Sequence, residues 1–263
     1  METPQFVEYI RRGITQIPHF DTSDVPDLVP PFLHLIKAPA HGPLGFIHTN
    51  NKAGEPEQEV DTGFYHRDGQ SSPDGTLYDR KWIFHYRQTL PRLLEERNPS
   101  FLKAHMPWIK KLAHVHARCV HFCHGVLEQI DRAYPHFRLR ALFDPIATRA
   151  EHVLRLIAYA DTQQPFLGKA HRDRSAQTMA LFESHPGLEG LVNRRYVARS
   201  SAPNRPLLFM GGSLAEVMQN EVPAFRHRVR YTNNTRVNEQ VIRFSVVFFF
   251  HARPGTLLKR PTH

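Results

Sequence analysis

The sequence predicts a mainly β protein in which an N-terminal region of helices and loops packs on a C-terminal antiparallel jelly roll. Two observations predict this fold. After Val153 the chain contains several short apolar runs separated by turn-forming segments, as in barrels and sandwiches. Between residues 100 and 137, in contrast, apolar residues recur at the spacing of an α-helix. The strand-like runs do not alternate with helices, so a parallel α/β sheet is not expected.

The N-terminal elements are interrupted by proline. The stretch PHFDTSDVPDLVPPFLHL cannot form one long helix. Residues 50–76 are polar and rich in Gly, Ser and Pro, which predicts a long loop. The helix that follows is expected to start with Ser100 as its N-cap, to extend to about Phe137 and to be open to a break at Pro107. A shorter helical or turn segment is expected near residues 142–150.

The strand-like runs are VLRLIAY, QTMALF, RPLLFM, RHRVRYT and IRFSVVFFF.

The chain has 263 residues, enough for one large domain. We therefore expect a single domain over 1–263 with three regions. These are an α/β and loop region over 1–100, a helical region over 101–150 and a jelly-roll core over 151–255.

Composition indicates an ordinary globular protein, with 41% hydrophobic and 22% charged residues. There is no unbroken apolar run of about 18 residues and no signal-peptide core, so a cytoplasmic location is expected. The formal net charge of +9 favours an anionic partner or substrate. Because the basic residues are scattered and no nucleic-acid motif occurs, we expect a small-molecule substrate, acidic or amino-acid-like, rather than nucleic acid.

His171 and Asp173 are separated by one residue in an extended segment, HRD. Alternation along a strand places such residues on one face. A histidine and a carboxylate are two of the three ligands in the 2-His-1-carboxylate site of non-haem Fe(II) oxygenases. His227, beyond two or three predicted strands, is the candidate for the third ligand.

Arg243 and Ser245 form a second pair on one strand face. A guanidinium binds a carboxylate through two parallel charge-assisted hydrogen bonds, and a serine hydroxyl adds a third. These two residues therefore predict a carboxylate-binding position.

A competing metal site lies on the predicted helix, where His114, His121 and His124 could share a face near Cys119 and Cys123. Zinc requires four ligands with short spacings and a second ligand-bearing segment, and no such segment is evident. We interpret these histidines as part of a helix surface. The two cysteines provide no disulfide framework.

Five segments resemble the isopenicillin N synthase-like family of Fe(II)/2-oxoglutarate oxygenases. HRDRSAQTMALFESHPGLEGL is similar to the family's H-x-D…T…GL signature, and RFSVVFFF is similar to its R-x-S strand. PLLFMGGSLAEVMQNEVPAFRHRV resembles the segment that ends in H-R-V. LYDRKWIFHY and LRLIAYAD resemble the upstream D-x-K-E-x-F and R-x-N-Y-Y-P segments. The matches occur in one order over roughly residues 76–252.

This resemblance implies a double-stranded β-helix, or distorted jelly roll, with a long helix packed on it and iron at its open end. It implies that His171, Asp173 and His227 bind Fe(II), and that Arg243 and Ser245 bind the distal carboxylate of 2-oxoglutarate with Tyr159 nearby. It also implies O2 as a substrate, release of succinate and CO2, and stimulation by ascorbate in some members. The departures from the motifs include Ile157 and Ala160 in place of Asn and Pro, and Gly211-Gly212 in place of Gly-Asp.

Several functions stay open at this stage. Hydroxylation is the default reaction, but desaturation or cyclisation would use the same centre. An oxidase that does not use 2-oxoglutarate would employ Arg243 and Ser245 for the carboxylate of its own substrate. A binding module without activity and a nucleic-acid demethylase are further alternatives. Substrate residues are expected in residues 50–76 and 231–240.

Overall fold

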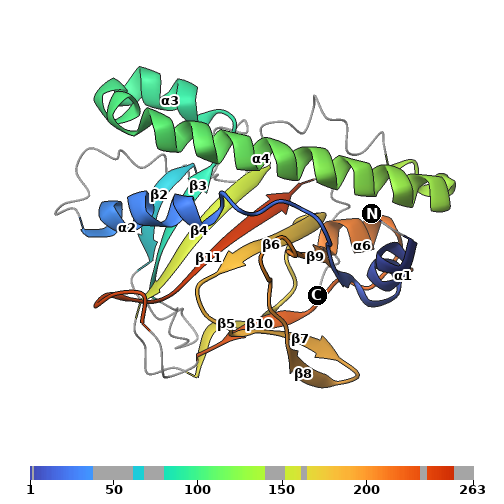
Figure 1. Cartoon of the computed structure of the whole chain (residues 1–263). Coiled ribbons are helices and arrows are strands. Elements are labelled where there is room, and N and C mark those ends of the chain that lie inside the picture. Colours follow the sequence, from blue (N-terminus) through green and yellow to red (C-terminus); the bar gives the residue numbers. More distant parts are fainter. Residues whose placement is uncertain are drawn as a thin grey trace, which may run out of the picture.

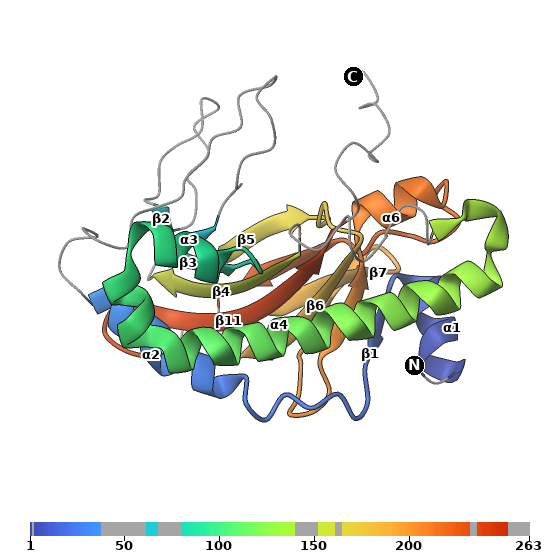
Figure 2. The same cartoon turned by 90° about the horizontal axis from the view of Figure 1, so that it is seen from above.

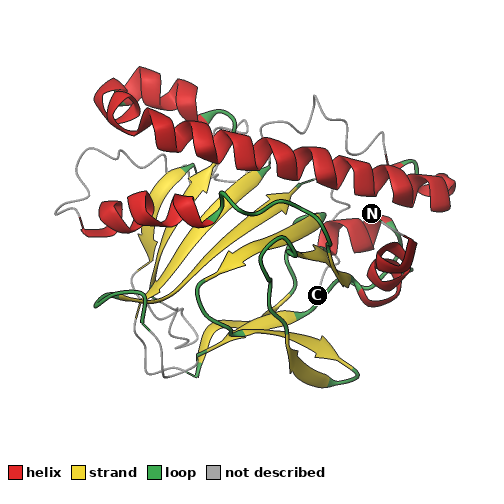
Figure 3. Ribbon diagram, viewed as in Figure 1, coloured by secondary structure: helices red, strands yellow, loops and turns green. Residues whose placement is uncertain are grey.

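Two antiparallel sheets face each other in the computed structural model, and helices cover the outer face of the larger one (Figures 1 and 3). The structure describes residues 1, 3–37, 62–67, 80–139, 152–160, 165–231 and 236–251. This arrangement is the distorted jelly roll that the sequence predicts, with the long helix lying across one sheet.

The larger sheet has seven strands in the order β1-β9-β6-β11-β4-β3-β2. At its centre β11 pairs with β4 on one side and with β6 on the other. The strands are β1 (Ile14–Gln16), β2 (Gly63–Arg67), β3 (Lys81–Tyr86), β4 (Val153–Ala160), β6 (Gln177–Glu183), β9 (Leu207–Met210) and β11 (Val241–Phe250).

The smaller sheet has four strands in the order β5-β10-β7-β8. They are β5 (Phe166–His171), β7 (Leu188–Val192), β8 (Arg195–Ala198) and β10 (His227–Arg230). The chain passes between the two sheets several times, so that residues far apart in the sequence meet in the space between them.

The long helix α4 (Pro99–Ala133) crosses the outer face of the larger sheet, as the view from above shows (Figure 2). Its N-cap is Asn98, whose side chain accepts a hydrogen bond from the backbone N–H of Phe101 at 3.1 Å. The prediction of Ser100 as the cap is wrong, because its hydroxyl donates to Asn98 Oδ1 instead. The helix continues through Pro107 and ends at Ala133, before the predicted Phe137.

Shorter helices complete the outer layer. They are α1 (Thr3–Arg12), the 3₁₀ turn η1 (Pro26–Leu28), α2 (Val29–Lys37), α3 (Leu90–Arg97), the 3₁₀ turn η2 (Pro135–Phe137) and α6 (Gly212–Val217). α2 lies against β4, and α3 lies against α4. Within the described part of the chain, no helix combines the length and apolar character that a membrane span requires.

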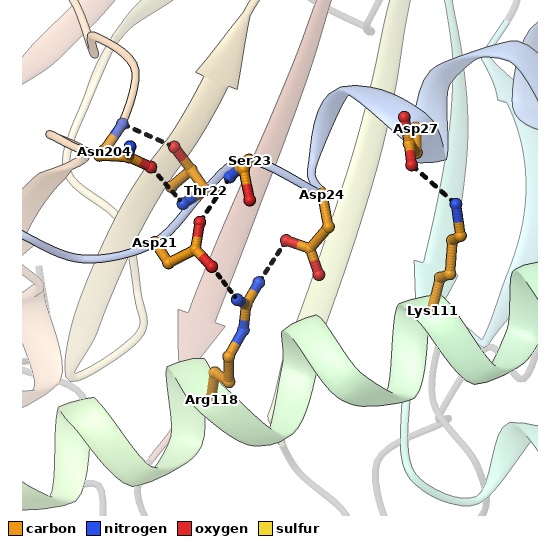
Figure 4. A network of polar contacts seen from close by, with 8 residues as sticks. All are labelled: Asp21, Thr22, Ser23, Asp24, Asp27, Lys111, Arg118 and Asn204. Atoms are coloured by element: carbon orange, nitrogen blue, oxygen red, sulfur yellow. Dashed lines mark hydrogen bonds and ion pairs between the residues drawn. The ribbon is translucent and has the colours of Figure 1, made fainter.

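The segment between β1 and α2 is held against α4 by ion pairs (Figure 4). Arg118 on α4 binds Asp24 and, at 3.4 Å, Asp21, while Lys111 binds Asp27 at 2.7 Å. The Lys111–Asp27 pair is exposed and contributes little stability alone, whereas the Arg118–Asp24 pair is half-buried. Together these contacts fix the path of the segment over the helix.

Two apolar clusters fill the molecule. The larger one lies between α4, α2 and the outer face of the larger sheet, and it includes Phe244, Phe248 and Phe250 of β11. The smaller one lies between the two sheets and includes Ile157, Tyr159 and Phe209. The second cluster leaves room for the polar side chains described below.

The predicted strands VLRLIAY, QTMALF, RPLLFM, RHRVRYT and IRFSVVFFF are confirmed as β4, β6, β9, β10 and β11. The prediction of a loop throughout residues 50–76 is wrong at Gly63–Arg67, which forms β2 and pairs with β3. The remainder of that loop and the helical segment predicted near 142–150 lie outside the described residues. The division into regions 1–100, 101–150 and 151–255 stays a prediction.

Candidate iron and cosubstrate site

Three predicted ligand residues meet at one end of the space between the sheets. His171 is the last residue of β5, and His227, the first residue of β10, is its direct partner in the sheet register. Asp173 Oδ1 lies 3.4 Å from His171 Nε2 and 3.9 Å from His227 Nε2. The ligand atoms of the three residues all lie within 4.8 Å of one another. The sheet register therefore brings together two histidines that are distant in sequence.

Asp173 reaches the histidines for a reason that differs from the sequence prediction. β5 ends at His171, so strand alternation does not place Asp173. The loop is fixed instead by Gly212, whose N–H donates to the Asp173 carbonyl at 2.7 Å. A Cβ at Gly211 would lie 1.9 Å from the carbonyl oxygen of Ser175, so the loop requires glycine there. The Gly211-Gly212 pair thus supports the backbone of Asp173.

Hydrogen bonds orient all three side chains toward a common centre. Thr178 donates to Asp173 Oδ2 at 2.7 Å, which leaves Oδ1 directed at the histidines. The Nδ1 atoms of His171 and His227 lie 2.7 Å and 3.4 Å from the carbonyl oxygens of Lys169 and Phe225. These contacts favour the tautomer with the proton on Nδ1, so the Nε2 lone pairs are available to a metal.

The electrostatic setting keeps the carboxylate of Asp173 ionised and favours the neutral imidazole of His227. Burial raises the pKa of Asp173, but the hydrogen bond to His171 and the charges of His227 and His171 outweigh it and lower the pKa to about 2. Burial lowers the pKa of His227, whereas the hydrogen bond to Asp173 raises the pKa of His171. An ionised carboxylate and neutral imidazoles are the forms that bind a divalent metal.

The helix histidines form no second metal-binding cluster among the described residues. In the part of the chain that the structure describes, His171, Asp173 and His227 are the only group of three or more such residues placed to hold a metal. On α4, His114 and His121 are exposed, whereas Cys119 and Cys123 are fully buried free thiols. The interpretation of this segment as a helix surface, rather than a zinc site, is consistent with this geometry.

A cavity of about 120 Å³ opens beside the three ligand residues and extends between the sheets. Arg243, Ser245 and Tyr159 line it together with the triad. Arg243 and Tyr159 are register partners on β11 and β4, and the guanidinium lies 5.4 Å from the centre of the Tyr159 ring. The predicted carboxylate-binding residues therefore share one cavity with the predicted metal ligands.

The carboxylate-binding position contains one orphaned polar atom. Ser245 is 5% exposed, and its Oγ has no hydrogen-bond partner within the described part of the chain. A buried hydroxyl without a partner destabilises the fold unless a ligand supplies that partner. Ser245 thus has the property expected of a residue that binds a ligand in the cavity.

Glu183 is a residue of this site that the sequence analysis missed. Its carboxylate accepts a hydrogen bond from Arg243 Nη2 at 2.6 Å, and Arg243 Nε donates to the carbonyl of His185 at 3.1 Å. Burial raises the pKa of Glu183 even though Arg243 opposes the shift. Two of the three nitrogens of the guanidinium are thus held in place.

Thr178, Lys81 and Arg155 also line the cavity and were given no role from sequence. Lys81 pairs in register with Tyr159, and Arg155 lies on the same strand face as Tyr159. Arg155 lies two and four residues from Ile157 and Tyr159 on β4. Alternation along β4 places Arg155 on the same face as Tyr159, and this was the signal available in the sequence. The sequence alone does not show which face of β4 lines the cavity.

Comparison with known proteins agrees with this geometry. Residues 150–252 match the family model described as the 2OG-Fe(II) oxygenase superfamily. The matched range contains the whole candidate site, so this part of the chain is that of a 2OG-Fe(II) oxygenase. Members of that superfamily use Fe(II), 2-oxoglutarate and O2. The chain is thus a non-haem Fe(II)- and 2-oxoglutarate-dependent dioxygenase. No curated protein matches it at the level of sequence.

Solved structures share the fold of this oxygenase. An oxygenase candidate from Shewanella oneidensis matches with a TM-score of 0.70 and 17% identity, covering 98% of this chain and 89% of that one. A full-length Neurospora crassa protein, solved in complex with α-KG and thymine, has a TM-score of 0.67 and 14% identity, with 98% and 84% covered. The dioxygenase for auxin oxidation from Arabidopsis thaliana has a TM-score of 0.64 and 13% identity, with 97% and 89% covered.

Proposed function

We propose that this oxygenase hydroxylates a small acidic molecule, with His171, Asp173 and His227 as the iron ligands. Arg243 and Ser245 bind the distal carboxylate of 2-oxoglutarate, and Tyr159 borders that position. One observation carries this proposal: three converging ligand atoms and a buried Arg–Ser pair open into the same cavity. Desaturation or cyclisation of the substrate would use the same residues.

The residues present fit both groups. One carboxylate and two imidazoles within 4.8 Å form the donor set of a non-haem iron site that leaves positions open for other ligands. The Oγ of Ser245, unpartnered among the described residues, and the buried guanidinium of Arg243 suit a carboxylate. Bound Fe(II), with 2-oxoglutarate and O2, supplies the oxidising chemistry and releases succinate and CO2.

The chain's own residues contribute position and the exclusion of water. Thr178 fixes the rotamer of Asp173, and the carbonyls of Lys169 and Phe225 fix the two imidazole rings. Arg243, held by Glu183 and His185, presents a pre-oriented guanidinium and loses little entropy on binding. Apolar side chains such as Leu188, Phe209 and Val247 complete the wall and exclude water from the reacting centre.

A small-molecule substrate agrees with the neighbours, whose names include thymine and auxin oxidation. The net charge of +9 supports an anionic substrate. We place the enzyme in the cytoplasm and assign it no nucleic-acid or membrane partner.

Anaerobic titration tests this assignment. Fe(II) is added to metal-free protein, 2-oxoglutarate is titrated, and the visible metal-to-ligand charge-transfer band is followed. We expect the band in the wild type, its loss in Asp173→Ala, and at least about a tenfold weaker cosubstrate affinity in Arg243→Met. Asp27→Ala, on the exposed surface, should behave as the wild type.

The other results separate the alternatives. Iron binding without a band would favour an oxidase that does not use 2-oxoglutarate. A wild-type protein that binds no Fe(II) would contradict the assignment of the triad.

A further inference from the structure

The cavity contains a second guanidinium, that of Arg155, which the proposed function does not use. Arg155 is partly buried on β4. Its Nε donates to His85 Nε2 at 2.6 Å, and its guanidinium lies 4.4 Å from the centre of the Phe249 ring. One edge of the guanidinium is thus fixed by His85, one of its faces is covered by Phe249, and the side chain still lines the cavity.

Arg155 lies at the opposite end of the cavity from Arg243. On the adjacent strands β4 and β11 (Figure 1), Arg155 pairs with Val247, whereas Tyr159 pairs with Arg243. Four residues along a strand correspond to about 13 Å. Arg155 and Arg243 therefore do not bind the same carboxylate group.

Arg155 lies instead at the triad end. Asp173 is bound by Thr178, and Thr178 is the register partner of Phe249. Phe249 in turn is the ring on which the Arg155 guanidinium rests. A molecule that contacts Arg155 and Phe249 would thus lie beside the three ligand residues, where a substrate must be placed.

The charge of Arg155 lacks an acidic partner among the described residues. The described acidic residues that line the cavity are Asp173 and Glu183, and both are engaged elsewhere, with the histidines and with Arg243. A partly buried guanidinium without a counter-ion is unfavourable, and an anionic ligand would relieve this cost.

The remaining wall around this position is apolar. Ile157, Val247, Phe249 and Phe209 line the cavity near Arg155 and the triad. None of the described acidic side chains there is free to receive an ammonium group. The wall therefore disfavours an amino acid and favours an apolar body that carries one carboxylate.

We propose that Arg155 determines specificity by binding the carboxylate of a substrate whose body is apolar, while His85 orients the guanidinium. This inference rests on the proposed function, because it places the substrate beside the iron ligands. It assigns Arg243 to the cosubstrate and Arg155 to the substrate.

Calorimetry with matched acids and amides tests the proposal. Protein loaded anaerobically with Fe(II) and 2-oxoglutarate is titrated with phenylacetate and hexanoate, and separately with phenylacetamide and hexanamide. The wild type should bind at least one acid about tenfold more tightly than its amide, because only the carboxylate pairs with Arg155. Arg155→Met should lose this preference while its charge-transfer band with 2-oxoglutarate is retained.

Two further variants complete the experiment. Arg195→Met removes one positive charge from an exposed position on β8 and should keep the preference. Arg155→Lys keeps the positive charge but lacks the planar guanidinium, so it should weaken acid binding severalfold. If Arg155→Met does not fold, Arg155→Lys still tests the proposal.

Wild-type protein that binds neither acid, or binds acids and amides equally, would overturn the role of Arg155. An Arg155→Met or Arg155→Lys variant with unchanged acid affinity would do the same. Absence of the charge-transfer band in the wild type would instead contradict the proposed function itself, so the two failures can be distinguished.

Discussion

The two faces of β11 differ in chemistry although both are buried. All but one of its ten residues are buried. The residues that face α4 and the main core are apolar, and they are Phe244, Val246, Phe248 and Phe250. The residues that face the cavity are two polar residues followed by two apolar ones: Arg243, Ser245, Val247 and Phe249.

This difference shows that burial alone does not separate a core position from a ligand position. On the helix side, ring packs against ring, as between Phe244 and Phe32, whose centroids are 5.5 Å apart. On the cavity side, the buried Ser245 Oγ lacks a hydrogen-bond partner among the residues that the structure describes. A polar group buried at a cost in stability indicates that a ligand completes that face.

The first prediction concerns the helix face. Phe248→Ala should lower the free energy of unfolding by about 3–5 kcal/mol, because it removes a fully buried ring and leaves a cavity. Chemical denaturation of the metal-free protein measures this loss. Val7→Ala, at a position 57% exposed, should change stability by less than about 0.5 kcal/mol. A loss below about 1 kcal/mol for Phe248→Ala would contradict the assignment of this face to the core.

The second prediction concerns buried histidines on the helix side. His116 on α4 contacts the carbonyl of His152 at 3.2 Å, and both rings are buried. Burial lowers the pKa of His116 to about 4 and that of His152 to about 2. Below about pH 6.5 the unfolded chain binds protons that the folded chain does not, so stability should fall as the pH falls from about 6.5 toward 4.

The expected slope is at most about 1.4 kcal/mol per pH unit for each buried histidine. Urea denaturation between about pH 8 and pH 5 measures it. His116→Gln should reduce the slope, whereas His121→Gln, on the exposed side of α4, should leave it unchanged. Equal slopes in the wild type and in His116→Gln would show that His116 is not the responsible group.

The third and smallest effect concerns the cavity face. Ser245→Ala should weaken 2-oxoglutarate binding by up to about tenfold, the value of one hydrogen bond, and should not lower stability. Ser184→Ala is the matched control, because Ser184 Oγ accepts from the backbone N–H of Phe244 at 2.8 Å and its loss should cost about 1 kcal/mol. Equal destabilisation by the two variants would remove the distinction between the faces.

Most of the site could be predicted from residue types and spacing. The triad and the Arg243–Ser245 pair follow from motifs, and the structure places them around one cavity. The prediction of Asp173 rests on strand alternation, but a turn held by Gly212 positions this residue instead. Hydrogen bonds between segments distant in sequence have no signature in a local pattern.

Glu183 illustrates what the sequence could not provide. Thr178 and Ala180 follow period-2 alternation on the cavity face of β6, which would direct Glu183 to the other face. The register with β11 shifts between Val246 and Val247, and beyond this irregularity Glu183 meets Arg243. A bulge that moves later residues to the other face of a strand depends on the pairing with the adjacent strand. It therefore cannot be predicted from the alternation pattern of one strand alone.

The cavity wall also sets a charge balance. Its described cations are Lys81, Arg155 and Arg243, and its described carboxylates are Asp173 and Glu183. The charges of Fe(II) and of the 2-oxoglutarate dianion cancel, so loading both leaves the net charge of these side chains unchanged. A substrate carboxylate would then meet the positive charge of Arg155, whereas a cationic group would be repelled by it. Charge at the last binding step would thus discriminate between substrates in addition to shape.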